Sequence, residues 1–161
     1  MDVKDKIIVV TGGGQGLGRA MAVELAKHGA KFALIDLNTD ALAESVAEVE
    51  AQGSTAIAYK TNVADEAEVE ATFKQIVADF GGIDGLINNA GILHDGMFVK
   101  AKDGVVAAKM SLQQFQSVID VNLTGVFLCG REAAVHMIEG RRKGVIINMS
   151  SVARAGNMGQ T

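Results

Sequence analysis

Short runs rich in Val and Ile alternate with helical stretches along the whole chain, and this alternation is the strongest constraint on its fold. Strands that alternate with helices form right-handed crossovers and therefore a parallel sheet. The runs are nearly all apolar, as expected for strands that helices cover on both faces. The pattern predicts an α/β fold with a doubly wound parallel sheet, whose five strands lie at residues 6–10, 31–36, 55–63, 83–91 and 144–150.

The helical stretches carry signals for their ends. Thr39 can cap the N-terminus of a helix that Gly53 ends, and Asp65 caps the clearest helix of the chain. Residues 92–111 show no clean period, and we expect a loop or a partly ordered insert there. Residues 112–140 again have a helical pattern.

A glycine-rich turn joins the first strand to the first helix, with the spacing T-G-x-x-x-G-x-G in place of a strict G-x-G-x-x-G. Gly12 allows a tight turn, Gly16 allows the backbone to approach a pyrophosphate, and Gly18 allows the helix to pack closely on the sheet. The N–H groups and dipole of the helix N-terminus favour phosphate. Alone, such a turn is weak evidence, but its position between a strand and a helix predicts a dinucleotide site.

An acid stands at the distance from this turn that such a site needs. Asp36 ends the second predicted strand, 18 residues after Gly18. A carboxylate there accepts hydrogen bonds from both ribose hydroxyls and repels a 2′-phosphate, which favours NAD over NADP. The alternative is a surface Asp at the end of a strand.

Composition and charge exclude several classes of partner. The net charge is −4, and the basic residues are scattered, whereas a nucleic-acid surface needs a clustered positive patch. No apolar stretch approaches the roughly 20 residues that span a bilayer, and the charged first residues do not form a signal peptide. The single cysteine fits a reducing cytoplasm. We expect one domain over residues 1–161, a cytoplasmic location, and no nucleic-acid or membrane partner.

Five motifs occur in order along the chain: TGGGQGLG in the turn, TNV at 61–63, NNAG at 88–91, VNLTG at 121–125 and INMSS at 147–151. With these motifs the chain resembles the short-chain dehydrogenase/reductase family over its whole length. Within the family it looks most like bacterial NAD-dependent 3-oxoacyl-acyl-carrier-protein reductases. The resemblance implies a Rossmann-like sheet, of which this chain supplies the first five strands.

The resemblance also implies which residues bind NAD. Asn62 and Val63 would flank the adenine, with Asn62 as an acceptor where relatives commonly carry Asp. NNAG alone would be read as a polar turn at the end of a strand. The full implied set is Gly12, Gln15, Gly16, Leu17, Gly18, Asp36, Leu37, Asn62, Val63, Asn89, Ala90, Gly91 and Val121.

Two further polar residues are implied as catalytic. Asn122 is a poor helix former inside an apolar helical stretch, so on its own it predicts a helix kink or a satisfied core amide. In the family, this Asn holds a water that links the active site to solvent. Ser151 would hydrogen-bond the substrate carbonyl, with Ser150 as second choice, although two serines at the end of a strand are more often only a turn.

The proton donor of the family is absent from these 161 residues. It is a Tyr followed four residues later by a Lys, on the helix after the serine. The single tyrosine here, Tyr59, belongs to no Tyr-x-x-x-Lys motif. We therefore expect the chain to be the N-terminal portion of an enzyme. The alternative is a non-catalytic NAD-binding fragment.

The resemblance predicts reduction of a ketone by NADH, with a 3-oxoacyl thioester as the best substrate and a small-molecule or carrier-linked carbonyl as partner. The alternatives are other alcohol, sugar or steroid dehydrogenases of the family. Arg142, in a basic turn, is a candidate contact for an acidic carrier. The helical region 112–138 would pack against a second subunit in a homotetramer. Cys129 is expected to be a core thiol, and the spacing of His94 and Asp95 predicts no metal site.

Overall fold

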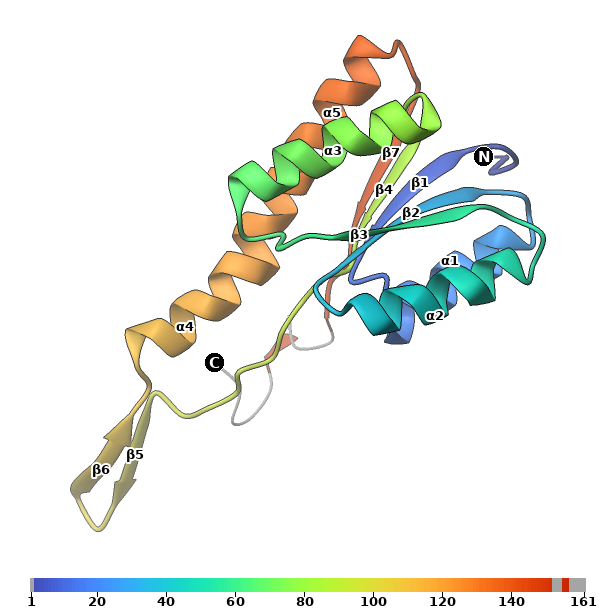
Figure 1. The fold of residues 1–161 in the computed structure, drawn as a ribbon. Helices are drawn as coiled ribbons and strands as arrows, with labels where there is room; N and C mark the ends of the chain where they lie inside the picture. Colours follow the sequence, from blue (N-terminus) through green and yellow to red (C-terminus); the bar gives the residue numbers. More distant parts are fainter. Residues whose placement is uncertain (1, 152–154, 157–161) are drawn as a thin grey trace.

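A computed structural model of the protein describes residues 2–151, 155 and 156. Its main sheet has strands β1 (Ile7–Thr11), β2 (Lys31–Asp36), β3 (Ala56–Lys60), β4 (Gly85–Asn88) and β7 (Val145–Asn148). The strand order is β3-β2-β1-β4-β7, and every neighbouring pair is parallel (Figure 1). The predicted doubly wound α/β sheet is therefore confirmed. The strands β3, β4 and β7 are shorter than expected, whereas β2 has its predicted bounds and β1 is shifted by one residue.

Helices cover both faces of this sheet. One face carries α1 (Gly16–Ala26) and α2 (Thr39–Glu50), and the other carries α3 (Glu66–Phe80) and α5 (Gly125–Glu139) (Figure 1). Successive side chains of a strand point to opposite faces. Accordingly Val9 packs with Phe73 of α3 and Cys129 of α5, whereas Ile8 and Val10 belong to the core under α1 and α2. Two buried cores therefore hold β1 at the centre of the molecule.

The helix caps differ in detail from those predicted. Asn38, and not Thr39, is the N-cap of α2, since its side-chain oxygen accepts from the N–H groups of Asp40 and Ala41. Asn is as good a cap as Thr and stands one residue earlier, where the backbone is still extended. The same helix ends at Glu50, before Gly53. Asp65 caps α3 as predicted, accepting from the N–H of Glu68.

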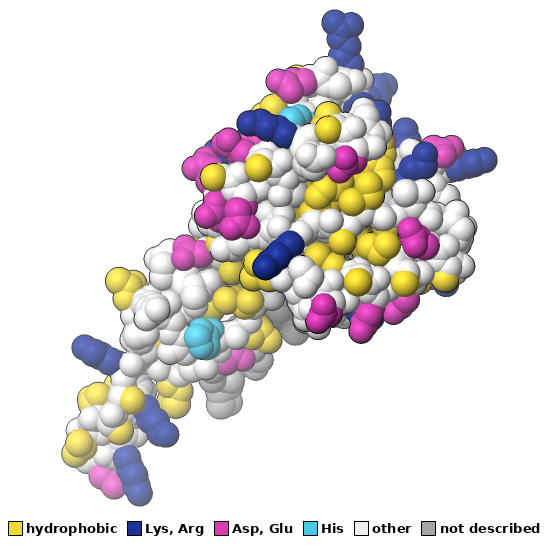
Figure 2. Space-filling model, in the orientation of Figure 1, with side chains coloured by type: hydrophobic (Ala, Val, Ile, Leu, Met, Phe, Trp, Pro, Cys, Tyr) yellow, Lys and Arg dark blue, Asp and Glu magenta, His cyan; other side chains and the backbone are white. Residues whose placement is uncertain are grey.

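Residues 92–111 contain a β-hairpin, so of the two expectations the partly ordered insert holds and the plain loop does not. Its strands are β5 (Val99–Lys102) and β6 (Val105–Lys109), which pair antiparallel. The connecting residues Asp103 and Gly104 both have positive φ, at 51° and 78°. Asp-Gly between two strands is a strong hairpin signal, which the search for one clean period missed. The hairpin projects away from the sheet (Figure 1), with basic side chains on both of its sides (Figure 2).

The helical region after the hairpin is interrupted. The helix α4 (Leu112–Ile119) continues into a π-helical turn, η1 (Asp120–Thr124), which leads into α5. A π-helical turn is a bulge in an α-helix and often lies at a functional site. Asn122 therefore lies where the regular α-helical pattern is interrupted.

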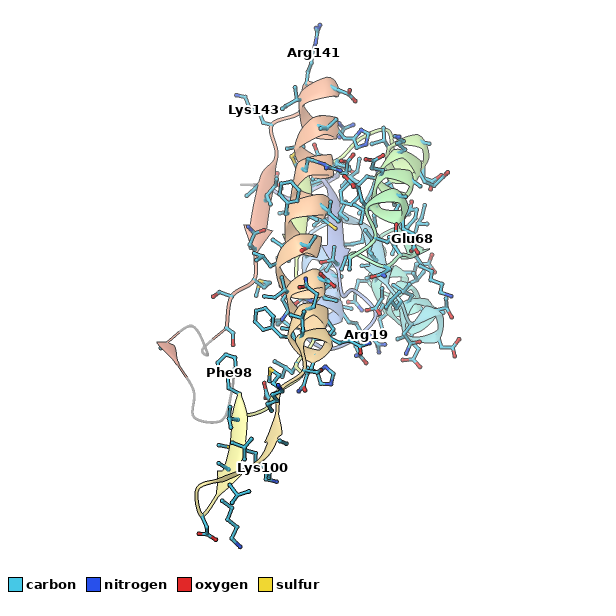
Figure 3. The ribbon with its side chains drawn as sticks, turned by 90° about the vertical axis from the view of Figure 1, so that its left-hand side faces the viewer. Arg19, Glu68, Phe98, Lys100, Arg141 and Lys143 are labelled. Atoms are coloured by element: carbon cyan, nitrogen blue, oxygen red, sulfur yellow. The ribbon has the colours of Figure 1, made fainter. Side chains whose placement is uncertain are left out.

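The basic turn before β7 has a structural use. The Arg142 guanidinium pairs with buried Asp84, Nη1 to Oδ2 at 2.9 Å, and donates to the Gly81 carbonyl. The same Asp84 oxygen accepts the Ile7 N–H at 3.0 Å. Arg142 thus ties the start of β7 to β1 and β4, whereas Arg141 and Lys143 extend away from the body (Figure 3). Arg142 is consequently a poor candidate for contact with a carrier.

Replacing Arg142 with Ala is expected to lower the free energy of unfolding by about 1–3 kcal/mol, because it leaves the buried Asp84 carboxylate without its cation. Urea unfolding measures this loss. Lys143→Ala is the matched control, since that neighbouring side chain makes no ion pair found among the described residues. Equal stability of the two variants would contradict the assignment.

Cys129 lies on α5 and is fully buried in the core with residues of the sheet, as predicted for a core thiol. Burial, with a smaller contribution from Glu132, raises the pKa of this thiol to about 12. A raised pKa keeps the thiol protonated below that pH, and only the thiolate is a good nucleophile. Iodoacetamide at pH 8 is therefore expected to leave the folded protein unmodified while it labels the urea-unfolded protein fully, as mass spectrometry measures. Labelling of the folded protein at the unfolded rate would contradict this burial.

Candidate cofactor site

The glycine turn between β1 and α1 is held so tightly that two of its positions leave no room for a side chain. Gly12 has a φ of 64°, and a Cβ on it would lie 2.9 Å from the Cα of Ala90. A Cβ on Gly18 would collide with the Gly12 carbonyl oxygen and lie 2.7 Å from the Asn89 amide nitrogen. Gly18 thus packs on the turn and on the residue after β4. By contrast, a Cβ on Gly16 would meet nothing within 4 Å, as expected where backbone faces an open site.

The residues after β4 brace this turn from the other side. The Asn89 amide nitrogen donates to the carbonyls of Thr11 and Gly12, each at 3.2 Å. The N–H groups of Asn89 and Ala90 both donate to the Thr11 hydroxyl at 3.0 Å. The carboxyl ends of β1 and β4 are therefore joined directly, and the Asn89 side chain is part of the join.

Asp36 lies at the end of β2 with its carboxylate held by backbone. The Gly14 N–H donates to Oδ2 at 3.0 Å, and the Asn38 N–H donates to Oδ1 at 3.1 Å. A carboxylate oxygen can accept more than one hydrogen bond. Each oxygen of Asp36 is therefore oriented and can still accept from a ligand hydroxyl.

Asn62 follows β3 in a turn of its own. Its side-chain oxygen accepts the Ala64 N–H at 3.1 Å, and its own N–H donates to Glu68 Oε2 at 2.8 Å. The Ala64 donor fixes which end of the amide is oxygen. The Asn62 Nδ2 is thus the end of the amide that this turn does not hold.

These segments surround one cavity of about 340 Å³. Ten of the residues predicted to bind a cofactor line it, whereas Gly16, Leu17 and Gly18 do not. The residues that were missed are Ile35, Thr61 and Ile92. Thr61 already belongs to the TNV motif, and the other two directly adjoin predicted residues. The cavity is lined by Gly12, Gln15, Ile35, Asp36, Leu37, Thr61, Asn62, Val63, Asn89, Ala90, Gly91, Ile92 and Val121.

Asn122 lies beside this cavity in the π-helical turn. Its Oδ1 accepts the Ile92 N–H at 2.8 Å, and its Nδ2 donates to the Ile92 carbonyl at 2.9 Å. The amide is therefore satisfied, but it is exposed and not part of the core. Both ends of the Asn122 side chain hold the backbone of Ile92, in the segment that follows β4. Asn122 therefore connects this rim of the cavity to the helical region that leads into α5.

Ser150 and Ser151 follow β7, which pairs with β4 up to Asn148 opposite Asn88. The two serines therefore continue from the same edge of the sheet as Asn89 and Ala90. Both are exposed, and neither is among the residues that line the cavity.

Tyr59 has no place in this cavity. Its hydroxyl donates to Asp79 Oδ2 at 2.7 Å on the far side of β3, under α3. Burial and the adjacent carboxylate raise its pKa above that of a free tyrosine. Among residues 2–151, 155 and 156, no cluster of three acidic, histidine or cysteine side chains has metal-binding geometry. No helix in the same residues is long and apolar enough to cross a membrane.

The sequence and the fold have counterparts among known proteins. Residues 6–161 match the model of the short chain dehydrogenase family. The chain is 41% identical over 157 residues to the 3-oxoacyl-[acyl-carrier-protein] reductase FabG of Staphylococcus aureus, which covers 96% of this chain and 60% of that protein. It is also 41% identical, over 152 residues, to the 2,5-dichloro-2,5-cyclohexadiene-1,4-diol dehydrogenase of Sphingobium indicum, covering 94% of this chain and 56% of that one.

A crystal structure of NAD⁺-bound xylitol dehydrogenase superimposes with a TM-score of 0.85 at 33% identity, over 99% of this chain and 58% of the other. The chain therefore spans about 60% of the length of the curated relatives it matches. The matched region includes the glycine turn, the asparagines after β3 and β4, and the π-helical turn. The chain belongs to the short-chain dehydrogenase family.

Proposed function

We propose that the complete protein is an NAD(H)-dependent oxidoreductase that reduces a ketone to a secondary alcohol. The observation that carries the proposal is Asp36, whose oriented carboxylate lines the cavity beside the glycine turn. Such a carboxylate accepts from the ribose hydroxyls of NAD and repels the 2′-phosphate of NADP. None of the described residues that line the cavity is a lysine or an arginine, which a 2′-phosphate would need.

We assign the predicted binding residues to the parts of a dinucleotide in order. The open backbone at Gly16 and the N-terminus of α1 would hold the pyrophosphate. Asn62 and Val63 would flank the adenine, with Asn62 donating through Nδ2. Asn89, Ala90, Gly91 and Val121 would line the nicotinamide half, and Gln15, Leu17 and Leu37 would cover the outer edge. The cofactor, when bound, supplies the hydride.

At the substrate end, we assign Ser151 to hydrogen-bond the carbonyl oxygen and Asn122 to hold the rim of the site in place. Donors aimed at the developing alkoxide stabilise it. The 161 residues contain no Tyr-x-x-x-Lys, so the proton must come from a residue outside them for the protein to turn over. Without such a residue, the chain is a non-catalytic NAD-binding fragment, which is the second candidate.

The best substrate class is a 3-oxoacyl thioester, small or linked to a carrier, on the strength of the similarity to the Staphylococcus aureus reductase. The chain is equally identical, at 41%, to a diol dehydrogenase, so other secondary alcohols are the alternative substrate class. We further propose a homotetramer, because α5 and the turn before it expose Leu123, Phe127, Val135 and Ile138.

A titration of the purified full-length protein with NADH, followed by an NADH oxidation assay on a 3-oxoacyl thioester, tests the proposal. Binding with turnover supports it. Binding with turnover only on diols or sugar alcohols would shift the substrate class, and binding without turnover would favour the non-catalytic candidate. Failure of the folded protein to bind NADH would overturn both.

A further inference from the structure

Arg19, on the first turn of α1, joins the glycine turn to α2 through an unusually large set of hydrogen bonds (Figure 3). Its Nη2 and Nε donate to the Gly14 carbonyl at 2.6 and 3.1 Å. Nε also donates to the Ser45 hydroxyl at 2.8 Å, while Nη1 and Nη2 pair with Glu48 and Glu44 at 3.0 and 2.9 Å. The Arg19 side chain remains only 20% exposed.

The carbonyl of Gly14 is the focus of these contacts. In addition to Arg19, the fully buried Ser45 donates its hydroxyl to the same oxygen at 3.0 Å. The carbonyl thus accepts from a cation and a buried hydroxyl, and charge-assisted hydrogen bonds of this kind are the strong ones. The backbone of Gly14 is therefore held in one conformation against α2.

The other polar group of Gly14 faces the cofactor site. Its N–H donates to Asp36 Oδ2 at 3.0 Å, and a Cβ on Gly14 would lie 2.9 Å from that same oxygen. The carboxylate therefore rests directly on the Gly14 backbone. A change in the conformation of Gly14 moves the donor that orients Asp36.

We propose that Arg19 is a positioning residue for cofactor choice: by anchoring Gly14 to α2, it holds the Asp36 carboxylate in the orientation that accepts the ribose hydroxyls of NAD. The inference rests on the proposed use of Asp36 to bind NAD. Glu44 and Glu48 occupy the remaining donors of the guanidinium, so Arg19 acts through Gly14 and not as a cation for a 2′-phosphate.

The test compares dissociation constants for NADH and NADPH, measured by nicotinamide fluorescence on the full-length protein, in the native protein and in Arg19→Ala. Loss of the charge-assisted bonds to Gly14 is expected to weaken NADH binding about tenfold and to leave NADPH binding nearly unchanged. The ratio of the NADPH to the NADH dissociation constant, which measures the preference for NADH, therefore falls about tenfold. A merely structural role in the turn would weaken both cofactors alike and leave the ratio unchanged, which would overturn the inference.

Two further variants complete the test. Arg131→Ala is the matched control. Like Arg19, which pairs with two carboxylates, Arg131 pairs with several, those of Glu66, Glu70 and Glu132, but it lies on α5 and away from the turn. Its ratio is expected to equal that of the native protein. Ser45→Ala removes one hydroxyl from the Gly14 carbonyl and serves if Arg19→Ala fails to fold. Its ratio is expected to fall in the same direction by about threefold, and an unchanged ratio would overturn the inference.

The design separates this inference from the proposed function. If the folded native protein binds no nicotinamide dinucleotide, or prefers NADPH, the proposed function fails and the inference fails with it. If the native protein prefers NADH and Asp36→Ala abolishes that preference while Arg19→Ala and Ser45→Ala do not, only the inference fails. In the double variant Arg19→Ala/Asp36→Ala, NADH binding is expected to be no weaker than in Asp36→Ala alone, because Arg19 acts on the ribose only through Asp36.

Discussion

Replacing Asp36 with Arg is expected to reverse the preference of the protein from NADH to NADPH. The substitution removes two acceptors for ribose hydroxyls and the charge that repels a 2′-phosphate, and it supplies a cation at the same strand end. Charged hydrogen bonds are each worth about 1.5–3 kcal/mol, so the ratio of the two dissociation constants is expected to change by about 100-fold or more. Fluorescence titration with each reduced cofactor measures the ratio.

Asp36→Asn is the matched control for this reversal. It keeps an acceptor for one of the two N–H donors, from Gly14 and Asn38, that now hold the carboxylate, and it removes the charge and the other acceptor. Its ratio is expected to lie between those of the native protein and of Asp36→Arg. An unchanged ratio in both variants would show that Asp36 is only a residue at the end of a strand.

Replacing Gly18 with Ala is expected to abolish cofactor binding or to unfold the turn. The added Cβ would meet backbone, the Gly12 carbonyl oxygen, which has no flexible end to move aside. Overpacking of this kind costs about 1–3 kcal/mol, and the upper value corresponds to about 100-fold in affinity if the strain falls on binding. Titration with NADH measures the loss of affinity, and urea unfolding measures the loss of stability.

Gly53→Ala is the control for this second prediction. Gly53 also has a positive φ, at 80°, but a Cβ there would meet nothing within 4 Å, and the residue lies after α2, outside the residues that line the cavity. It is expected to lose roughly 1–2 kcal/mol of stability through backbone strain and no affinity for NADH. Equal binding by the Gly18→Ala and native proteins would contradict the close packing of the turn.

The parts of the fold that could be predicted are those that local pattern determines. Each strand of the main sheet is a short apolar run, and α3 is predicted by its N-cap Asp65 and its apolar stripe. The hairpin at 99–109 escaped because its strands are fully exposed and show no buried face, although Asp103 and Gly104 signalled the turn. The π-helical turn at Asn122 depends on two hydrogen bonds to Ile92, 30 residues away, which no local pattern contains.

The candidate site divides in the same way. Gly12, Asp36 and Asn89 were predictable because they stand in motifs at the ends of strands, where a parallel sheet brings them together. Arg19 and Ser45 were not, because a contact across 26 residues between two helices leaves no spacing signal. Arg142 was assigned to a partner because its turn is basic, and its bond to Asp84 depends on burial that the sequence does not show.

The pairing of β1 with β4 joins the walls of the cavity through contacts that are far apart in the sequence. Thr11 reaches its partners Asn89 and Ala90 across 78 and 79 residues of chain, whereas β1 and β2 pair over a much shorter loop. Contacts so distant in sequence close slowly during folding. The walls of the cavity therefore depend on contacts that are distant in sequence, and a dinucleotide that touches both walls would bind only the folded protein. A ligand of this kind would stabilise the protein by mass action, so the melting temperature is expected to rise with the concentration of added dinucleotide.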